Sequence, residues 1–497
     1  MNILLIQPPI TLKKNETFAV TPPLGLAYLG AVAEQIGHHV TILDTVVEGF
    51  NLRSDEGHLT RIGLPKDAIK RKIEEVKPDL VGITCPFTLM DREMRCVASI
   101  VKSVNSGILV VVGGAHPSSM PDNVIADNNI DFLVLGEGEI TFSILLKSIQ
   151  ESEEFEKIKG LWFKKKGKII RNSPNEFIED LDTIPFPAMH LLPLEKYLSL
   201  GEAHGSQKRK RYMPMVTSRG CPGRCVFCSI HTVWGHKWRA RTPENVVNEI
   251  EMLVSKYGIR EIHFEDDNLT LSKKRIMKIC DLIIERGLDI TWATPNGVAI
   301  NTLDLAILQK MKKSGCYQLN FGIESGDPFV LRNVINKPLN LERVRRVVNW
   351  SKWLGIWTHG FFVIGFPTES LESIRRTIRF AKELDLDSAN FFIATPYPGT
   401  LLNALASSEG LIKEDFDLSK LRTMDASIDT NLFKAKDMIA LQKKAYFEFI
   451  IYRLKREFID GYFIIRLMRT KSTDNLLFFL QKIRKRVIPT MSLDTKK

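Results

Sequence analysis

Apolar residues in the first 150 positions gather into short continuous runs, and stretches with helical spacing separate these runs. The runs cover residues 2–7, 39–43, 79–84, 108–112 and 132–135, and the helical patterns include residues 24–35, 68–76 and 90–104. Continuous apolar strands joined by helices are typical of a parallel sheet that is buried on both faces. The pattern therefore predicts a doubly wound, Rossmann-like α/β domain over residues 1–150.

A second region of alternating strands and helices begins near Met213. Its predicted strands cover residues 214–218, 261–265, 291–294, 317–323, 360–364 and 390–394, and its helical patterns cover residues 245–256, 273–285, 304–313, 341–354 and 371–384. The first helix has a clear start signal, with Thr242 as N-cap and Pro243 at the first helical position. Six βα units are too few for a closed eight-stranded barrel. They predict an open, partial (β/α)6 barrel over residues 209–420, with its site at the carboxyl ends of the strands.

The segments outside these two regions have different patterns. Residues 151–208 predict a hairpin that turns at Gly167, followed by a proline-containing linker. After Lys420 the alternation stops, and residues 421–497 predict a basic, helical C-terminal extension with a long helix over residues 435–469.

The chain has 497 residues, of which seven are cysteines, and three of these crowd into eight positions. An odd and uneven set of this kind is not a disulfide framework and indicates a reducing, cytoplasmic location. Cys280 and Cys316 fall inside a helical pattern and at a strand edge. The N-terminus has neither a basic region nor a small-residue cleavage site, and no run of about 18 apolar residues occurs, so we expect no signal peptide and no membrane-spanning helix.

The net charge of +11 belongs largely to the end of the chain, where residues 451–497 contain twelve Lys or Arg and four Asp or Glu. No nucleic-acid-binding module is recognisable, so we expect no nucleic-acid partner. Residues 475–487 mix aromatic, aliphatic and basic side chains. This mixture has two interpretations, which stay open: a helix that packs on the barrel, or a basic amphipathic helix that lies on an anionic membrane.

The strongest chemical signal is the loop that follows the first predicted barrel strand, because it carries Cys221, Cys225 and Cys228. Soft thiolates favour iron–sulfur clusters, zinc or copper(I). A structural zinc site normally takes four protein ligands, and His231 is the residue that would complete one here. Three thiolates on a four-iron cluster leave one iron open to a small molecule. The spacing therefore favours a catalytic cluster, with structural zinc as the alternative.

The CxxxCxxC spacing at a barrel strand end, with an aromatic residue before the third cysteine, resembles the radical S-adenosylmethionine (SAM) superfamily. In that family the open iron binds the amino and carboxylate groups of SAM, and one electron cleaves SAM to methionine and a 5′-deoxyadenosyl radical. The resemblance covers residues 210–410. It implies a [4Fe–4S] cluster held by the three cysteines and an electron donor of the flavodoxin or ferredoxin type.

Three later segments resemble the SAM site of the same family. Residues 263–268 (HFEDDN) stand where the family usually has Gly-Gly-Glu. This departure leaves Asp266 or Asp267 as the candidate for the SAM amino group, and a solvated acidic turn as the alternative. The resemblance also implies that Glu324 recognises the SAM ribose or carboxylate and that Gly365 lies at the adenine-contacting turn.

In the N-terminal region, polar residues and glycines follow successive predicted strands. Asp44 and Gly49 follow the second strand, Thr84 follows the third, and Gly113 and Gly114 follow the fourth. A doubly wound sheet binds ligands at these strand ends, and glycine lets a flat ligand approach the backbone. The five residues resemble the DxHxxG, SxL and GG pattern of cobalamin-binding domains, which implies that they bind cobalamin.

One departure from the cobalamin pattern bears on the chemistry. Val46 stands where the family has the histidine that ligates cobalt from below, so the resemblance implies a base-off cobalamin. The glycine turn at residues 135–139 and the segment at residues 21–25 are typical of cobalamin domains fused to radical SAM domains. We expect His116, on a loop, to be solvated. No GxGxxG follows the first strand, which argues against a dinucleotide; a Rossmann-like domain that binds another nucleotide, or nothing, is the alternative.

Together the two resemblances imply a cobalamin-dependent radical SAM enzyme that modifies an unactivated carbon, with C-methylation as the main expectation. Oxidative cyclisation or rearrangement would use the same cofactor-binding residues. Two further alternatives are a corrinoid- or metal-binding protein without radical catalysis, and a radical SAM enzyme whose first domain only recognises the substrate. The apolar character of residues 394–400 and of the C-terminal helices indicates a hydrophobic small-molecule substrate. No general acid or base is assigned.

Overall fold

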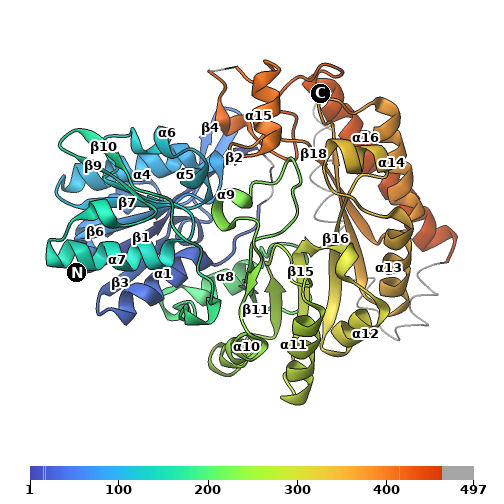
Figure 1. Cartoon of the computed structure of the whole chain (residues 1–497), viewed down its shortest axis with the longest axis horizontal. Helices are drawn as coiled ribbons and strands as arrows, with labels where there is room; N and C mark the ends of the chain where they lie inside the picture. Colours follow the sequence, from blue (N-terminus) through green and yellow to red (C-terminus); the bar gives the residue numbers. More distant parts are fainter. Residues whose placement is uncertain (15, 17, 414, 462–497) are drawn as a thin grey trace.

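The computed structural model describes residues 1–461 except 15, 17 and 414, and these form two lobes (Figure 1). The first lobe contains a seven-stranded sheet with the order β10-β9-β8-β7-β6-β1-β3, and the second contains a six-stranded sheet with the order β11-β14-β15-β16-β17-β18. The predicted fold class is confirmed: a Rossmann-like parallel sheet is followed by a parallel six-stranded sheet of βα units.

The first sheet is buried on both faces, as its continuous apolar strands predict. Its parallel strands are β1 (Asn2–Gln7), β3 (His39–Asp44), β6 (Leu80–Thr84), β7 (Leu109–Gly113) and β8 (Phe132–Val134). The helices around it are α1 (Leu24–Gln35), α2 (Thr45–Glu48), α3 (Lys66–Val76), α4 (Asp91–Val104), α5 (Ala115–Ser119), α6 (Pro121–Ile125) and α7 (Gly138–Glu151). Ile3 and Leu5 belong to one apolar cluster and Leu4 and Ile6 to another, so alternate side chains of β1 face opposite helical layers.

The hairpin predicted within the inter-domain segment extends the first sheet instead. Strands β9 (Leu161–Lys165) and β10 (Lys168–Arg171) turn at Gly167 and add to β8 in antiparallel fashion. The sheet of the first lobe therefore continues beyond residue 150, where we placed the domain boundary. Helix α8 (Leu194–Leu200) lies in the segment that follows.

A small antiparallel sheet at one end of the first lobe was not predicted. It consists of β2 (Ile10–Lys13), β5 (Leu59–Ile62) and β4 (Arg53–Glu56). Its buried residues include Thr11 and Arg61, which both donate hydrogen bonds to Glu93 on α4, at 3.0 and 2.8 Å. Polar residues that are buried through such tertiary pairs give no period-2 apolar signal.

The second sheet follows the chain order expected of a partial barrel. Its strands are β11 (Tyr212–Met215), β14 (Glu261–Phe264), β15 (Thr291–Val298), β16 (Cys316–Glu324), β17 (Trp357–Ile364) and β18 (Ser388–Ile393). The helices between and after them are α10 (Pro243–Tyr257), α11 (Lys273–Glu285), α12 (Leu305–Lys313), α13 (Leu341–Trp353), α14 (Leu371–Glu383) and α15 (Leu401–Ser408). Helix α10 begins as predicted, with Pro243 in its first turn and Thr242 accepting a hydrogen bond from the Asn245 N–H.

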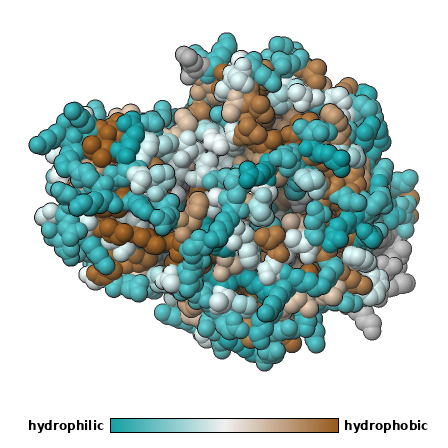
Figure 2. Space-filling view, viewed as in Figure 1, coloured by the Kyte–Doolittle hydropathy of each residue, from teal (hydrophilic) through white to brown (hydrophobic). Residues whose placement is uncertain are grey.

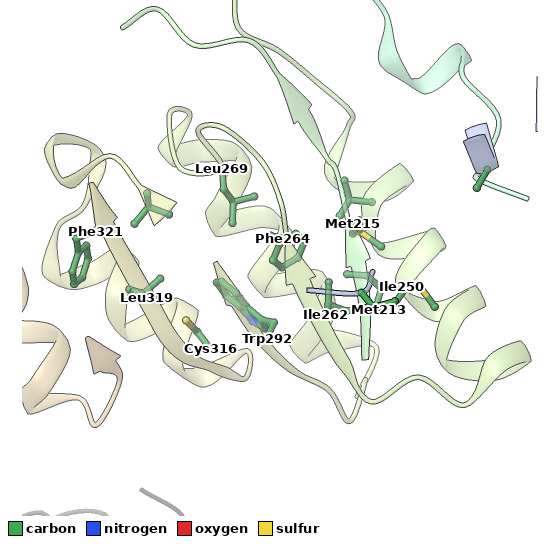
Figure 3. Close-up of a cluster of buried hydrophobic side chains, with 14 of the residues drawn as sticks. Met213, Met215, Ile250, Ile262, Phe264, Leu269, Trp292, Cys316, Leu319 and Phe321 are labelled. Carbon is green, nitrogen blue, oxygen red and sulfur yellow. The ribbon is translucent and has the colours of Figure 1, made fainter. Parts of the chain in front are cut away.

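The core between the strands and helices of the second lobe is apolar (Figure 3). Trp292 of β15 packs edge to face on Phe264, with ring centroids 5.3 Å apart. Cys316 lies in the same cluster and is 1% exposed, and Cys280 on α11 is fully buried. Both cysteines are therefore core residues, as their sequence patterns predicted.

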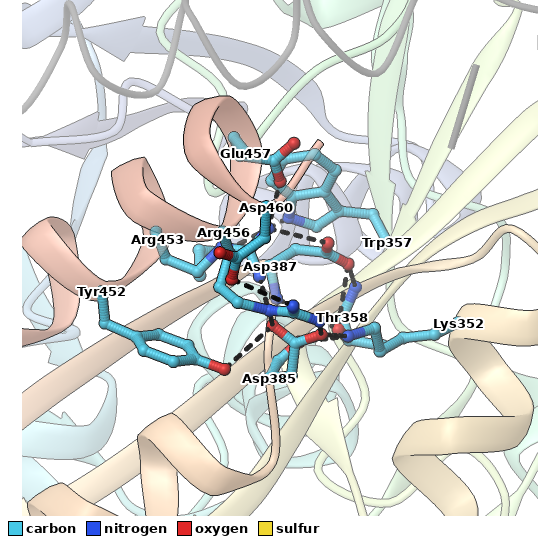
Figure 4. A network of polar contacts seen from close by, with 11 residues as sticks. Lys352, Trp357, Thr358, Asp385, Asp387, Tyr452, Arg453, Arg456, Glu457 and Asp460 are labelled. Carbon is cyan, nitrogen blue, oxygen red and sulfur yellow. Dashed lines mark hydrogen bonds and ion pairs between the residues drawn. The ribbon is translucent and has the colours of Figure 1, made fainter. Parts of the chain in front are cut away.

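Helix α16 (Ala435–Leu454) packs against β18 and α14, and a polar network holds its end (Figure 4). Asp385 accepts hydrogen bonds from Arg453 at 2.7 Å and from Tyr452 at 3.3 Å, and it also pairs with Lys352. The helix predicted over residues 435–469 begins as expected and passes into a π-helical turn, Lys455–Ile459, before the described residues end. Residues 475–487 lie outside the described residues, so both interpretations of this segment stay predictions.

The face of the molecule in Figure 2 is largely hydrophilic, and hydrophobic side chains gather there in separate areas. One such area lies over α15, where Leu401 and Leu405 are exposed. Within the described part of the chain, no helix combines the length and apolar character needed to cross a bilayer.

Candidate active site

The three motif cysteines lie in the loop between β12 (Ser218–Arg219) and α9 (His231–Trp234). All three are free, partly exposed thiols. A Cβ atom on Gly223 would lie 3.4 Å from Cys221 Sγ and 3.9 Å from Cys225 Sγ, so both thiols border this glycine. Burial raises the pKa of Cys228 to about 12, and the charges of Cys225 and Cys221 act in the same direction. The three sulfur atoms are therefore close enough to influence one another.

This arrangement fits a cluster better than a structural zinc ion. Among the described residues, no three His, Cys, Asp or Glu side chains are grouped so that they could hold a metal ion together. His231, the residue that would complete a zinc site, stacks on His236 with ring centroids 3.7 Å apart. Thiolates that bind different irons of a cluster need not converge on one point, whereas zinc ligands must. The donor set thus fits a [4Fe–4S] cluster with three cysteine ligands.

Neighbouring segments hold the cysteine loop in place. Gly220 has φ +80°, and a Cβ there would lie 2.3 Å from the Lys237 carbonyl oxygen, so only glycine fits this close approach. The Val226 N–H donates to the Ile335 carbonyl at 3.0 Å. The loop is thus fastened both to the segment before β13 (Arg239–Ala240) and to the turn that follows β16.

Asp266 ties the end of β14 to the start of the cysteine loop. It is 1% exposed and accepts hydrogen bonds from the Thr217 N–H at 2.8 Å, the Thr217 hydroxyl at 2.7 Å and the Ser218 hydroxyl at 2.5 Å. Both of its carboxylate oxygens are therefore engaged within the protein. The geometry gives Asp266 a structural role beside the cysteine loop.

Asp267 differs from Asp266 in the hydrogen bonding of its carboxylate oxygens. Oδ2 is buried and has no hydrogen-bond partner among the described residues. Burial raises the pKa of Asp267 to about 7, with a further contribution from the charge of Asp266. A hydrogen bond from the Gly220 N–H opposes this rise in pKa and places the carboxyl group beside the cysteine loop. Of the two aspartates we predicted, the geometry favours Asp267 for a cationic ligand group.

Glu324 ends β16 beside the cysteine loop. Its φ of +67° is in the left-handed region, which is uncommon for a residue other than glycine. Lys337 Nζ lies 2.8 Å from Glu324 Oε1 and 2.7 Å from the Gly322 carbonyl oxygen. The charges of Lys337 and Glu324 both act on the Cys225 thiol. Sequence reasoning missed Lys337, because a lysine in a turn carries no signal until the fold brings it to Glu324.

Gly365 forms a turn that requires glycine. It has φ +85°, and a Cβ atom would lie 2.8 Å from Met438 Sδ on α16. Its N–H donates to Glu369 Oε2 at 2.7 Å, and the Phe366 N–H donates to the same atom at 3.3 Å. The other oxygen of Glu369 has no partner among the described residues, and burial raises the pKa of this carboxyl group to about 8.

In the first lobe, Asp44 is engaged in the same way as Asp266. Its Oδ1 accepts hydrogen bonds from the N–H groups of Val46 at 2.8 Å and Val47 at 3.1 Å, which caps α2. Its Oδ2 accepts from the Tyr197 hydroxyl at 2.6 Å. Burial raises the pKa of Asp44 to about 6, although these hydrogen bonds oppose the shift. Both carboxylate oxygens of Asp44 are thus already hydrogen-bonded within the protein. Its predicted contact with cobalamin stays a prediction.

The glycines at this edge allow backbone segments to touch. A Cβ on Gly49 would lie 2.3 Å from the Leu64 nitrogen. Gly114 has φ +117°, and a Cβ there would lie 2.8 Å from the Cys85 carbonyl oxygen. Gly113, at the end of β7, pairs with Thr84 at the end of β6. The edge therefore presents compact backbone, which suits a flat ligand such as a corrin ring.

Two side chains near this edge bear on cobalt ligation. Val46 is 6% exposed within α2 and offers no ligand atom, in accord with a base-off cobalamin. His116 was expected to be solvated, and this expectation was wrong. It is 2% exposed on α5, with Nε2 3.1 Å from Asp91 Oδ1 at the start of α4.

The carboxyl ends of the strands in the first and second sheets, called the candidate cobalamin edge and the candidate SAM edge, meet at the junction between the lobes. Helix α9, which follows the cysteine loop, lies between the lobes in Figure 1 and contacts α5, which follows Gly114. Ser119 Oγ on α5 is 3.3 Å from Thr232 Oγ1 on α9. A Cβ on Gly399 would lie 2.5 Å from Thr232 Cγ2, so the loop after β18 also reaches this junction.

Comparison with known protein families agrees with both lobes. Residues 15–146 match the B12 binding domain. Residues 215–381 match the radical SAM superfamily. The first match includes β3, β6, β7 and β8 of the first sheet, and the second includes β14, β15, β16 and β17 of the second sheet.

Curated relatives match most of the chain. An uncharacterized methyltransferase of Pyrococcus horikoshii is 37% identical over 453 residues, which cover 91% of this chain and 93% of the relative. Cytidylyl-2-hydroxyethylphosphonate methyltransferase of Streptomyces wedmorensis is 34% identical over 451 residues, or 84% of each chain. An anaerobic magnesium-protoporphyrin IX monomethyl ester cyclase of Rubrivivax gelatinosus is 28% identical over 404 residues, or 80% of this chain and 68% of the cyclase.

Two solved structures share the fold. The radical SAM methyltransferase TsrM of Kitasatospora setae superposes with a TM-score of 0.66 at 21% identity, covering 83% of this chain and 77% of TsrM. The cobalamin-dependent radical SAM enzyme OxsB, with aqua-cobalamin and SAM bound, superposes with a TM-score of 0.70 at 15% identity, covering 98% of this chain and 75% of OxsB. The chain belongs to the family that joins a B12-binding domain to a radical SAM domain, and it is a radical SAM enzyme with a [4Fe–4S] cluster, SAM and cobalamin as cofactors, related to B12-dependent radical SAM methyltransferases.

Proposed function

We propose that this enzyme methylates an unactivated carbon atom of a small-molecule substrate. The observation that carries the proposal is the contact between α9, directly after the cysteine loop, and α5, directly after Gly114. Because these helices abut, a substrate held at the junction of the lobes would lie between the SAM edge and the cobalamin edge. Two relatives above 30% identity are named methyltransferases, which supports the same reaction class.

When bound, the cluster and SAM supply a 5′-deoxyadenosyl radical, and cobalamin supplies the methyl group. The protein's own residues hold and orient these groups. Cys221, Cys225 and Cys228 would hold three irons, and Asp267 would accept hydrogen bonds from the SAM amino group. The Glu324–Lys337 pair would fix the SAM ribose or carboxylate beside Cys225.

The cobalamin edge would act mainly through shape. Gly113 and Gly114 would keep the backbone at this edge compact, so that a flat corrin ring could lie on it, and the buried Val46 offers no side-chain atom that could ligate cobalt. Asp44 would keep α2 and the preceding strand end in the conformation that this contact needs.

We propose a hydrophobic substrate, because aromatic side chains line one face of the last barrel strands. Phe361 and Phe392 pack with ring centroids 5.6 Å apart, and the His359 ring lies edge-on to Phe361 at 5.0 Å. Phe362 and Phe391 belong to the helix-facing core, so Phe361 and Phe392 point to the opposite face of the sheet. A flavodoxin- or ferredoxin-type protein would supply the electron for SAM cleavage.

The test is anaerobic reconstitution with iron, sulfide and hydroxocobalamin, followed by turnover with SAM labelled in its methyl group. We expect bound iron, a corrinoid absorption spectrum, 5′-deoxyadenosine and a labelled product from a panel of hydrophobic small molecules. A product that is altered without label would contradict methylation and favour oxidative cyclisation or rearrangement, as in the named cyclase relative. Corrinoid binding without SAM cleavage would contradict radical catalysis.

A further inference from the structure

A buried cluster of opposite charges joins the two lobes next to the cysteine loop. Glu137 and Glu139 lie at the start of α7 in the first lobe. Arg219 and Arg239 lie on β12 and β13, where they are direct cross-strand partners in the two-stranded sheet that flanks the cysteine loop. These four residues are called the inter-lobe latch below.

The contacts within the latch are close and repeated. Arg219 Nη2 donates to Glu139 Oε1 at 2.5 Å, and Arg219 Nη1 lies 3.2 Å from Glu137 Oε1. Arg239 Nη1 lies 2.8 Å from both carboxylate oxygens of Glu137. Each arginine therefore binds a carboxylate of the other lobe, and Glu137 is shared by both arginines.

Solvent is nearly excluded from the latch. The side chain of Glu137 is 0% exposed, Arg239 is 2%, Arg219 is 7% and Glu139 is 11%. Burying charges costs solvation free energy, and apolar residues of similar volume often stabilise a protein as well or better. Stability alone therefore does not require charged groups at this position. A fixed position of one lobe relative to the other does require them, because the directional hydrogen bonds of these ion pairs form only when the two lobes are aligned.

Further contacts tie the latch to the segment between the lobes. Arg239 donates to the Ile178 carbonyl at 2.7 Å, and Glu137 accepts from the Ile178 N–H at 2.7 Å. The Arg239 guanidinium also lies over the Phe177 ring, 4.8 Å from its centroid. The latch thus fastens three segments that are far apart in the sequence.

Both ends of the latch lead directly to a cofactor edge. On one side, Arg219 directly precedes Gly220 and Cys221, and Gly220 packs tightly on the Lys237 carbonyl. On the other side, Glu137 follows β8, and β8 pairs with β7 so that Val134 lies opposite Gly113. A short path therefore links Gly113 to Cys221: it runs through the Gly113–Val134 strand pair and then through the side-chain contacts of Glu137 and Glu139 with Arg219.

We propose that Glu137 and Glu139 are positioning residues: through Arg219 and Arg239 they set the distance between cobalamin and the iron–sulfur cluster. This inference rests on the proposed function for its purpose, since two cofactors that serve one substrate must be held at a fixed separation. Measuring this distance requires only the two bound cofactors and no substrate.

The test measures the distance between cob(II)alamin and the reduced cluster by pulsed electron paramagnetic resonance on the reconstituted full chain. The wild type is expected to give one narrow distance distribution. Glu139→Gln and Arg219→Lys should each make it about twofold broader, because a loosened contact permits ångström-scale motion of one lobe against the other. The matched control is Glu93→Gln, which breaks a buried pair with Arg61 (2.8 Å; side chains 4% and 10% exposed) inside the first lobe, and it should leave the distribution narrow.

Equal widths in the wild type, Glu139→Gln and Arg219→Lys would overturn the proposal. So would loss of both cofactors to the same extent in Glu139→Gln and in the Glu93→Gln control, because the latch would then act only on stability. Loss of cobalamin from Glu139→Gln, with the cluster signal and SAM cleavage retained, would support it. A wild type that gives a narrow distance but transfers no methyl group would contradict the proposed function while leaving the latch supported.

Discussion

The acidic residues at the carboxyl ends of the two sheets make different contacts; the end of the first sheet is called the first edge and that of the second sheet the barrel edge. In the first lobe, both oxygens of Asp44 accept hydrogen bonds from the protein. In the barrel lobe, Asp267 and Glu369 each keep one buried oxygen that has no partner among the described residues. Unpartnered buried oxygens cost free energy unless a ligand satisfies them. The unpartnered oxygens of the barrel edge can therefore accept hydrogen bonds from a cationic or hydrogen-bond-donating ligand. At the first edge the carboxylate of Asp44 is already satisfied by the protein, so this edge offers its backbone to a ligand.

Substitution of a cysteine that binds the cluster should have the largest effect, because it removes the chemistry of the barrel edge. We expect Cys225→Ala to lose the cluster, so that iron falls well below the roughly four per chain of a full cluster and 5′-deoxyadenosine is no longer formed. Iron analysis and chromatography of the SAM cleavage products check this. Cys280→Ala is the control, because Cys280 is buried on α11 and should retain iron. An iron-loaded, active Cys225→Ala variant would contradict the ligand assignment.

The two neighbouring aspartates offer a sharper comparison within the barrel edge. Asp267→Asn should weaken SAM binding about tenfold to a hundredfold, the range expected for losing one hydrogen bond to a charged group. Asp266→Asn should instead lower the melting temperature, since Asp266 accepts hydrogen bonds from Thr217 and Ser218, and should leave SAM affinity of the folded protein nearly unchanged. Calorimetric titration of SAM and thermal unfolding separate these effects. Equal SAM affinities in the two variants would contradict the assignment of Asp267.

At the first edge, removal of the acidic group should act on stability. Asp44→Ala removes the cap of α2 and the Tyr197 hydrogen bond, so we expect a loss of about 2 kcal/mol in the free energy of unfolding. Tyr197→Phe removes one of these contacts and should cost about 1 kcal/mol. Chemical denaturation monitored by circular dichroism measures both. Unchanged stability together with lost corrinoid binding in Asp44→Ala would make Asp44 a direct ligand and remove the contrast between the edges.

The sequence predicted most of the elements on which these sites stand. The strand at residues 2–7 and the helix at residues 24–35 have the predicted bounds, because their burial depends on local apolar pattern alone. The unpredicted sheet of β2, β5 and β4 depends instead on Arg61 pairing with Glu93, which lies on another element. Local pattern cannot show a polar residue that becomes buried only through a distant partner.

The same distinction applies to the sites. The three cysteines were found from spacing, because their geometry is set within one loop. The contacts of Lys337 with Glu324 and of Arg219 with Glu137 and Glu139 were not found, since the fold creates them. The turn at residues 135–139 was noted for its glycines, yet its glutamates make the contacts between the lobes. Choosing between Asp266 and Asp267 also required the hydrogen-bond partners that only the structure supplies.

The smallest expected effect concerns the other unpartnered carboxyl group, Glu369, and appears as a pH dependence. Burial raises its pKa to about 8 in the folded protein, although the Gly365 and Phe366 N–H groups oppose this. The unfolded pKa is near the usual glutamate value of about 4.3, so between these values the folded state binds more protons. Stability should therefore fall as the pH rises through this interval, and no further loss is expected from this group above the folded pKa.

Glu369→Gln removes that titration while its side-chain carbonyl can still accept both N–H groups. We expect the difference in melting temperature, variant minus wild type, to increase by a few degrees from about pH 6 to about pH 9. Differential scanning calorimetry of the apoprotein at both pH values measures the difference. Asp44→Asn serves as the comparison, because the lower pKa of Asp44, about 6, places most of its loss below this interval. A difference between Glu369→Gln and wild type that does not change with pH would mean that Glu369 is already ionised at about pH 6, so that its pKa is no higher than that of Asp44 at the first edge.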